Sequence, residues 1–303
     1  MTESALIAGQ LFNGISVASI LLLVALGLAL SFGLMRVINM AHGEMLMMGG
    51  YLSYLAIRVA PRGTGLFAAL IVAFAGTALF GALLEFVLIR RLYGRPLDTL
   101  LATWGVSLIL QQGARSLFGP IGVDVTAPAR LTGSIGIHAG PLAGFSLPLV
   151  RLFIIALSAL VLGMVALFIA RTRLGLLVRA VHQDRDMAEA LGVNTRMVDL
   201  AVFALGTGVA GLAGSALTLI APVTPIVGQS YIVYAFLVVI VGGLGSLTGT
   251  LLAAIMVGIF SASVQIFTSV STADVLLLLF VIAFIQFRPR GIVAVRSRAL
   301  EEA

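Results

Sequence analysis

The chain contains no cysteine. It also contains no lysine, and all 18 of its Lys and Arg positions are arginine. Without cysteine it can form no disulfide and use no thiol chemistry. Without lysine it can contain no P-loop, whose lysine reaches the nucleotide phosphates, and it can form no lysine Schiff base. If ATP powers this protein, another subunit must therefore bind the nucleotide.

Charged residues are also scarce, at 10% of the 303 residues against 60% hydrophobic. A soluble domain carries roughly a quarter charged residues. Apolar runs of about 20 residues recur instead, as spanning a hydrocarbon layer of roughly 30 Å requires. We count about nine apolar segments: 11–34, 44–59, 66–89, 99–118, 149–170, 198–220, 230–241, 249–267 and 273–287. We predict an all-α polytopic membrane protein in which residues 1–303 form a single transmembrane domain.

The distribution of arginine predicts which loops face the cytoplasm, because basic residues gather in cytoplasmic loops. If 171–196 is cytoplasmic, 13 of the 18 arginines lie on that side and five lie at or near the outer side. We therefore predict an external N-terminus and a cytoplasmic C-terminus. The net charge of +6 then reflects topology rather than nucleic-acid binding. We expect no cleaved signal peptide, because no basic residue precedes Arg36.

Two of the apolar segments, 44–59 and 230–241, are short for a straight span. In transporters, short or glycine-interrupted segments often mark helices that break near the bilayer midplane. We therefore expect broken or re-entrant helices.

The stretch 119–148 is rich in glycine and proline, too long for a tight turn and too irregular for a span. It falls on the predicted external side. We expect it to form a small cap of short strands or hairpins that can meet a soluble partner.

A polar island, 171–196, lies between two long apolar stretches and is predicted to be cytoplasmic. Inside it, the residues from Asp186 to Gly192 predict a short helix. Asp186 can cap the first N–H groups, with Glu189 three residues on, as in a capping box. Gly192 can end the helix in a left-handed conformation. We expect this helix to dock on a partner in the aqueous phase.

The most unusual polar cluster within the apolar segments consists of Asn39, His42 and Glu44. Ionisable groups at membrane depth are costly and usually line a cavity or pair with one another. One interpretation is therefore a pathway lining or a hinge between two helices. The other is an ordinary cytoplasmic turn, with Asn39 capping the next helix and Glu44 in its first turn. His42 and Glu44 do not share a helical face, and we expect no metal site here.

Thr103 and Ser107 are four residues apart, so they share one face of a predicted helix. Hydroxyls inside a helix bundle can bind a polar solute, but they can equally bond their own helix or join neighbouring helices. The chain's only tryptophan, Trp104, lies between them. Trp104 either lines the path or anchors its helix at a membrane interface.

Glycine is concentrated at two places. The loop that contains Gly242, Gly243 and Gly245 predicts a hinge or a broken helix, and it is no phosphate cradle because no lysine follows. A second set lies along one predicted helix, where close helix packing is the simplest role. That set is Gly206, Gly208, Gly211 and Gly214.

No catalytic set emerges from the sequence. The three histidines are far apart, and none stands in a metal-ligand spacing. Glu85 and Asp274 lie in or beside apolar segments, but neither has a visible partner for acid–base work. We therefore expect no enzyme activity, no bound metal and no cofactor on this chain.

Four segments carry a resemblance to a known family. They are INMAHGEMLMMGGY (38–51), RPLDTLLATWGVSLILQQ (95–112), RTRLGLLVRAVHQDRDMAEALGVNT (171–195) and VVIVGGLGSLTGT (238–250). Together they resemble the permease subunits of high-affinity branched-chain amino acid and urea/amide ABC importers, over nearly the whole chain. The segments 95–112 and 228–250 look more like the urea type. That type, however, often has Asp where this chain has Tyr234.

The resemblance implies a multi-pass permease of the bacterial inner (plasma) membrane that carries urea or a small amide, with branched-chain amino acids as the alternative. The implied partners are a second permease subunit, a periplasmic solute-binding protein, the lipid bilayer and two cytoplasmic ATPases that hold ATP and Mg²⁺. In that family the region from Ala188 to Gly192 corresponds to the coupling helix that docks on the ATPase. The residues expected at this contact are Arg179, Asp186, Ala188, Glu189, Ala190 and Gly192.

Urea is neutral, so its path should offer hydroxyls, amides and carbonyls rather than full charges. The residues expected along the path are Asn39, His42, Glu44, Thr103, Trp104, Ser107, Gly242, Gly243 and Gly245.

Three rival classes remain. A passive channel needs no docking helix and leaves 171–192 unexplained. A secondary transporter needs buried acidic residues for ion coupling, for which Glu44, Glu85 and Asp274 are the candidates. A structural scaffold would not need broken segments.

Overall fold

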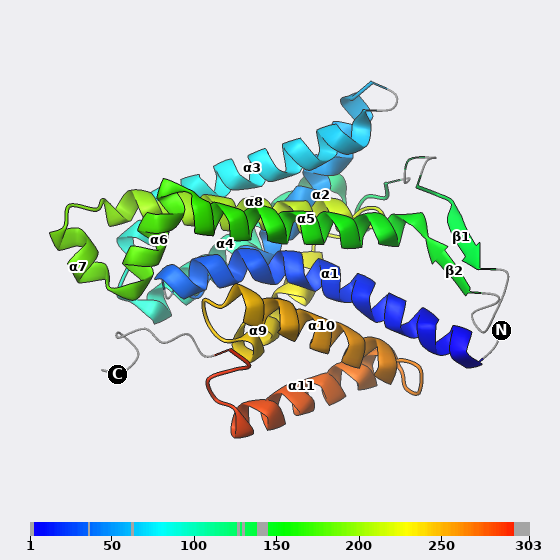
Figure 1. Ribbon diagram of the computed structural model, residues 1–303. Coiled ribbons are helices and arrows are strands. Elements are labelled where there is room, and N and C mark those ends of the chain that lie inside the picture. The colour runs from blue at the N-terminus through cyan, green and yellow to red at the C-terminus, as the bar shows by residue number, and fades with distance from the viewer. Residues whose placement is uncertain are drawn as a thin grey trace.

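The computed structural model describes residues 3–35, 37–61, 64–125, 128, 131–137 and 145–293. These residues form a bundle of long helices with one small β-hairpin (Figure 1). The helices are α1 (Glu3–Met35), α2 (His42–Val59), α3 (Gly65–Val87), the short 3-10 helix η1 (Ile89–Arg91), α4 (Pro96–Phe118), α5 (Leu149–Arg171), α6 (Arg173–Gln183), α7 (Arg185–Ala190), α8 (Thr195–Leu217), α9 (Val227–Gly242), α10 (Leu247–Val264) and α11 (Val270–Phe287). The strands are β1 (Ser134–Ile137) and β2 (Phe145–Pro148), which pair antiparallel.

Each of the nine predicted apolar segments overlaps one long helix, which is consistent with a polytopic helical membrane protein. By length and composition, six helical stretches of the described chain can cross a membrane. They are Ile7–Gly33, Gly65–Arg91, Leu149–Arg171, Thr195–Leu217, Leu247–Val264 and Val270–Phe287. A crossing number of nine stays a prediction, because α9 is short and neither α2 nor α4 is among these stretches.

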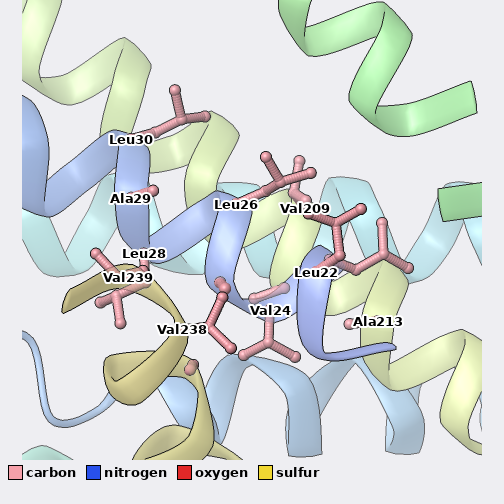
Figure 2. Packing of buried hydrophobic residues seen from close by; sticks show 14 of the residues in the cluster. Leu22, Val24, Leu26, Leu28, Ala29, Leu30, Val209, Ala213, Val238 and Val239 are labelled. Atoms are coloured by element: carbon pink, nitrogen blue, oxygen red, sulfur yellow. The ribbon is translucent and has the colours of Figure 1, made fainter. Parts of the chain in front are cut away.

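The helix α1 lies at the centre of the bundle. It is apolar on all sides, a pattern typical of a helix that is buried all round. It packs against α8, α9 and α10, among others. Figure 2 shows Leu26 towards Val209 of α8, and Val24 beside Val238 of α9. All four of these side chains are buried, so the core of the molecule is built around α1.

The helix α8 packs against α1, α2 and α3 through the predicted glycine stripe. A Cβ atom added at Gly206 would lie 2.6 Å from Gly27 O in α1, and one at Gly214 would lie 1.9 Å from Leu46 O in α2. Gly208 and Gly211 face α3 in the same way. The prediction that this stripe serves close packing is confirmed.

The two ends of the bundle differ. The β-hairpin and the start of α1 lie at one end, whereas α6, α7 and the turn between α9 and α10 lie at the other (Figure 1). The expected short strands in 119–148 are therefore present, although 126–127, 129–130 and 138–144 lie outside the described residues. The hairpin of the predicted external loop and the helices α6 and α7 of the predicted cytoplasmic loop thus lie at opposite ends, and which end faces the cytoplasm stays a prediction. The predictions that involve Arg36, Arg62, Arg130, His138 and the tail 294–303 also concern residues outside those described.

Candidate functional site

The turn that leads into α2 is buried within the bundle. Asn39, His42 and Glu44 are all less than 2% exposed, so this is not a solvated turn. Asn39 does not cap α2: Ala41 is the capping residue, and Asn39 Oδ1 instead accepts a hydrogen bond from Ala41 N at 3.0 Å. This side chain closes the turn locally, in the manner of an Asx turn.

The start of α2 lies deep along α1. His42 Nε2 is 3.2 Å from Val24 O, so Nε2 carries the proton and Nδ1 remains an acceptor. Val24 is four residues from the middle of the apolar span Ile7–Gly33, or about 6 Å at 1.5 Å per residue. In addition, a Cβ added at Gly43 would lie 2.1 Å from Gly228 O, so the first turns of α2 and α9 touch. The first turns of the two short helices α2 and α9 thus lie together beside α1, and the broken or re-entrant character of these helices stays a prediction.

Glu44 is held by side chains from α4. Ser107 Oγ and Gln111 Nε2 each donate a hydrogen bond to Glu44 Oε1 at 2.9 Å. The second oxygen, Glu44 Oε2, is buried and has no hydrogen-bond partner in the described part of the chain. The backbone of Gly228 in α9 is close, because a Cβ there would come within 2.7 Å of Oε2. Half of this carboxylate is therefore free to accept a further donor.

Thr103 fulfils two of the roles that the sequence left open. Its hydroxyl donates to Thr99 O at 2.8 Å in its own helix, and it accepts from Met40 N at 3.1 Å. With Ser107 and Gln111 it forms one buried polar face of α4 directed at the turn before α2 and at its first turn. Sequence reasoning missed Gln111, although the spacing of four residues that links 103 to 107 continues to 111.

Trp104 lies on another face of α4. Its side chain is 49% exposed, like that of its neighbour Leu108 at 43%. It is therefore not brought to the polar cluster around Glu44, and its surroundings fit the anchoring alternative.

Four buried polar atoms between residues 39 and 51 have no hydrogen-bond partner among the described residues. They are Asn39 Nδ2, His42 Nδ1, Glu44 Oε2 and Tyr51 Oη. Most buried polar groups in proteins are paired. Such a concentration of unpaired donors and acceptors is what a polar solute or water can satisfy.

The glycine loop lies at the end of the bundle that carries α6. Gly243 and Gly245 adopt left-handed backbone angles, with φ of 99° and 80°, which accounts for glycine at both positions. Gly245 packs beside His182 of α6, and the segment after α11 bonds the end of α9 through Ile292 N to Val241 O at 2.8 Å. The three predicted path glycines therefore do not join the cluster around Glu44.

An apolar pocket is lined by residues that neighbour each of these two places in the sequence. It has a volume of about 240 Å³ and is bordered by Ile38 and Met40 on one side and by Leu244 of the glycine loop on the other. Its remaining lining residues are Phe32, Phe236, Val239 and Ile240. The polar cluster thus adjoins an apolar space that the sequence did not reveal.

The short helix in the polar island exists, but its predicted cap is wrong. Asp184, not Asp186, is the N-cap, because its extended backbone places Oδ1 where Met187 N donates to it at 2.9 Å. Glu189 does not complete a capping box: it accepts a hydrogen bond from Thr195 Oγ1 at 2.5 Å. The left-handed conformation of Gly192 is confirmed by its φ of 84°.

Most of the predicted docking residues reach the surface around α7. Arg179, Asp186, Glu189, Ala190 and Gly192 are exposed, whereas Ala188 is buried. Two apolar side chains that were not predicted, Met187 and Leu191, are 57% and 78% exposed there. This surface combines apolar and charged groups.

The two acidic residues without a visible partner are paired in the structure. Glu85 Oε1 accepts from Tyr93 Oη at 2.9 Å, and Asp274 Oδ1 accepts from Tyr234 Oη at 2.5 Å. The second bond links α9 to α11. Among the described residues, no three His, Asp or Glu side chains gather as metal ligands.

Comparisons with known proteins find one family of transport permeases. A family model described as "Branched-chain amino acid transport system / permease component" matches residues 10–285. The chain is 29% identical over 291 residues to the high-affinity branched-chain amino acid transport system permease protein BraD of Pseudomonas aeruginosa, which covers 93% of this chain and 94% of that relative.

Two further relatives extend the likeness. The corresponding permease protein LivH of Escherichia coli K12 is 28% identical, over 93% of this chain and 94% of that protein. A probable branched-chain amino acid transport permease protein LivH of Methanocaldococcus jannaschii is 26% identical, over 94% and 91%. No solved structure matches the chain.

Proposed function

The chain belongs to the family of permease components of branched-chain amino acid transport systems, and on this premise we propose that it imports a branched-chain amino acid as the membrane-spanning subunit of an ATP-driven ABC transporter. It is a multi-pass inner-membrane protein. The expected urea specificity is not supported, because the family model and all three relatives are described by branched-chain amino acid transport. These descriptions favour the alternative solute.

The observation that carries this proposal is the polar cluster beside an apolar pocket. An amino acid presents a cationic ammonium group and, in leucine, isoleucine or valine, a branched apolar side chain. Glu44 Oε2 is an unpaired buried acceptor that suits an ammonium donor. The pocket of about 240 Å³ bordered by Met40 suits the apolar side chain. Urea has neither a charge for the carboxylate nor an apolar part for the pocket.

The helix α4 contacts both the pocket residue Met40 and the carboxylate of Glu44. Thr103 binds the backbone of Met40 and Ser107 binds Glu44, and these residues are one helical turn apart, about 6 Å. In this proposal Asn39 and His42 contribute further polar groups to the path. The loop of Gly242, Gly243 and Gly245 acts as a hinge beyond the pocket, and Trp104 anchors α4 at its outer surface.

The proposed energy source lies on other subunits. Because the chain has no lysine, it cannot hold ATP in a P-loop of its own. Two ATPase subunits that bind ATP and Mg²⁺ would dock on the surface around α7, where Met187 and Leu191 are exposed. A second permease subunit and a periplasmic solute-binding protein complete the importer.

Uptake of radiolabelled leucine and urea, in cells with and without the cognate ATPase, tests this proposal. We expect leucine uptake that exceeds urea uptake and disappears without the ATPase. Urea uptake above leucine uptake would contradict the proposal that the solute is a branched-chain amino acid. Uptake that persists without the ATPase would indicate a passive channel, and uptake lost to an uncoupler while ATP is maintained would indicate a secondary transporter.

A further inference from the structure

The helix α7 is tied to the membrane helix α8 by a two-point ion pair. Arg185 Nη2 is 2.5 Å from Asp199 Oδ2, and Arg185 Nη1 is 3.3 Å from Asp199 Oδ1. The Asp199 side chain is completely buried, near the start of α8. A guanidinium that donates to both oxygens of one carboxylate fixes orientation as well as distance. The direction of α7 is therefore set by α8.

The same arginine reaches α3 through a tyrosine. The Arg185 guanidinium carbon lies 5.6 Å from the centre of the Tyr93 ring, within the range of a cation–π contact. Tyr93 Oη donates to Glu85 Oε1 at 2.9 Å, and Glu85 is a completely buried residue of α3. Arg90 Nε lies 3.9 Å from the same oxygen.

Tyr93 keeps its proton in this setting. Burial raises the pKa of Tyr93, and the nearby charges of Asp199 and Glu85 raise it further. The hydroxyl therefore remains a donor to Glu85. At the other end of α7, Glu189 accepts from Thr195 Oγ1 and lies 3.7 Å from Arg185 Nε.

We propose that Glu85, Tyr93, Arg185 and Asp199 form a transmission cluster with two buried carboxylates, whose members position α7 and carry its movement to α3 and α8 during ATP-driven transport. The inference rests on the proposed function, in which α7 docks on the ATPase. Exposed ion pairs stabilise a protein little. In this pair Arg185 is 36% exposed but Asp199 is completely buried, so separating the two leaves an uncompensated buried carboxylate, which is strongly unfavourable. Movement of α7 that kept this pair intact would therefore carry α8 with it.

The cluster connects to the proposed solute path through α8. Farther along this helix, Gly214 packs against the backbone of Leu46, two residues after Glu44 in α2. A shift of α8 would therefore press directly on the helix that begins at the path. This contact chain supplies a physical connection between the two sites, and coupling itself is what the experiment must measure.

The test uses the complete importer, reconstituted in proteoliposomes with its solute-binding protein. Two quantities are measured: the stimulation of ATP hydrolysis by the leucine-loaded binding protein, and the leucine transported per ATP hydrolysed. Asp199→Asn keeps the size of the side chain but removes its charge. Arg196→Gln, at an exposed arginine in the first turn of α8 and outside the cluster, is the matched control.

We expect the Asp199→Asn importer to lose stimulation by about fivefold or more, the lower range of typical coupling between sites. Leucine transported per ATP should fall with it, whereas Arg196→Gln should match the wild type. An Asp199→Asn importer that assembles and retains wild-type values of both quantities would overturn the inference. A role in stability alone would lower the amount of importer without changing leucine per ATP.

A second variant decides the matter if Asp199→Asn does not assemble. Tyr93→Phe removes only the hydroxyl that binds Glu85 and keeps the ring beside Arg185. Assembly with reduced stimulation supports the cluster, and assembly with unchanged stimulation contradicts it. Failure of the proposed function is seen separately, because it appears in the wild-type importer as leucine transport without ATP hydrolysis or as no leucine transport.

Discussion

Two buried carboxylates, Glu44 and Asp199, are used in opposite ways. Glu44 accepts two hydrogen bonds from neutral side chains on one oxygen and leaves the other unpaired. Asp199 engages a guanidinium with both oxygens. A carboxylate with a free oxygen can exchange partners with a passing solute, whereas one that is fully engaged resists any separation. The comparison distinguishes a group suited to binding from one suited to transmitting force.

The largest expected effect comes from leaving Asp199 without its cation. Arg185→Ala should lower the free energy of unfolding by about 3 kcal/mol, since an unpaired buried charge typically costs 3–5 kcal/mol. We place the effect at the lower end because the Arg185 side chain is 36% exposed. Thermal unfolding of the purified protein in detergent measures it, with Arg196→Ala as the control. Equal unfolding temperatures for the two variants would show that Asp199 does not depend on Arg185 for its stability in the buried site.

The contact between Gly214 of α8 and Leu46 of α2 joins the two regions. Disrupting it should lower the free energy of unfolding by nearly as much. A methyl group at Gly214 would lie 1.9 Å from Leu46 O, a backbone atom that cannot rotate away. Gly214→Ala should therefore destabilise the protein by about 2.5 kcal/mol, within the usual range for overpacking. Gly163→Ala in α5 is the matched control, because a Cβ there meets nothing within 4 Å. The control should be neutral or slightly stabilising, as alanine favours helix.

Removal of charge from Glu44 should act on binding rather than on folding. Glu44→Gln keeps the size of the side chain but offers an ammonium group no anionic partner. A hydrogen bond to a charged group contributes about 2 kcal/mol, so the apparent affinity for leucine in uptake should fall about thirtyfold. Concentration-dependent leucine uptake gives this value. An unchanged affinity would show that Glu44 does not bind the solute.

The smallest expected effect concerns the hydroxyl that positions Met40. Thr103→Val removes the acceptor for Met40 N and should weaken leucine uptake about fivefold, equivalent to about 1 kcal/mol. Thr99→Val is the control on the same face of α4, since among the described residues the Thr99 hydroxyl bonds only the backbone oxygens of Leu92 and Arg95. If both variants lose uptake to the same extent, Thr103 has no specific role in the proposed solute path.

The local features of the fold were predictable from the sequence. The apolar segments, the shared face of Thr103 and Ser107 and the left-handed Gly192 follow from residue spacing within one helix or turn. The predicted N-cap of α7, Asp186, was wrong because Asp184 and Asp186 both suit the role by residue type. Only the backbone angles, extended at Asp184, select between them.

The membrane class and the absence of a nucleotide-binding lysine were determined by the sequence alone, because hydropathy and composition require no knowledge of contacts. The partners of Glu44 and Asp199 were decided by the tertiary structure. Gln111 and Glu44 are 67 residues apart, and Arg185 and Asp199 lie on different helices 14 residues apart. Whether Glu44 or Asp199 keeps a free oxygen depends on how α4, α7 and α8 pack, and no periodicity within a single helix contains that information.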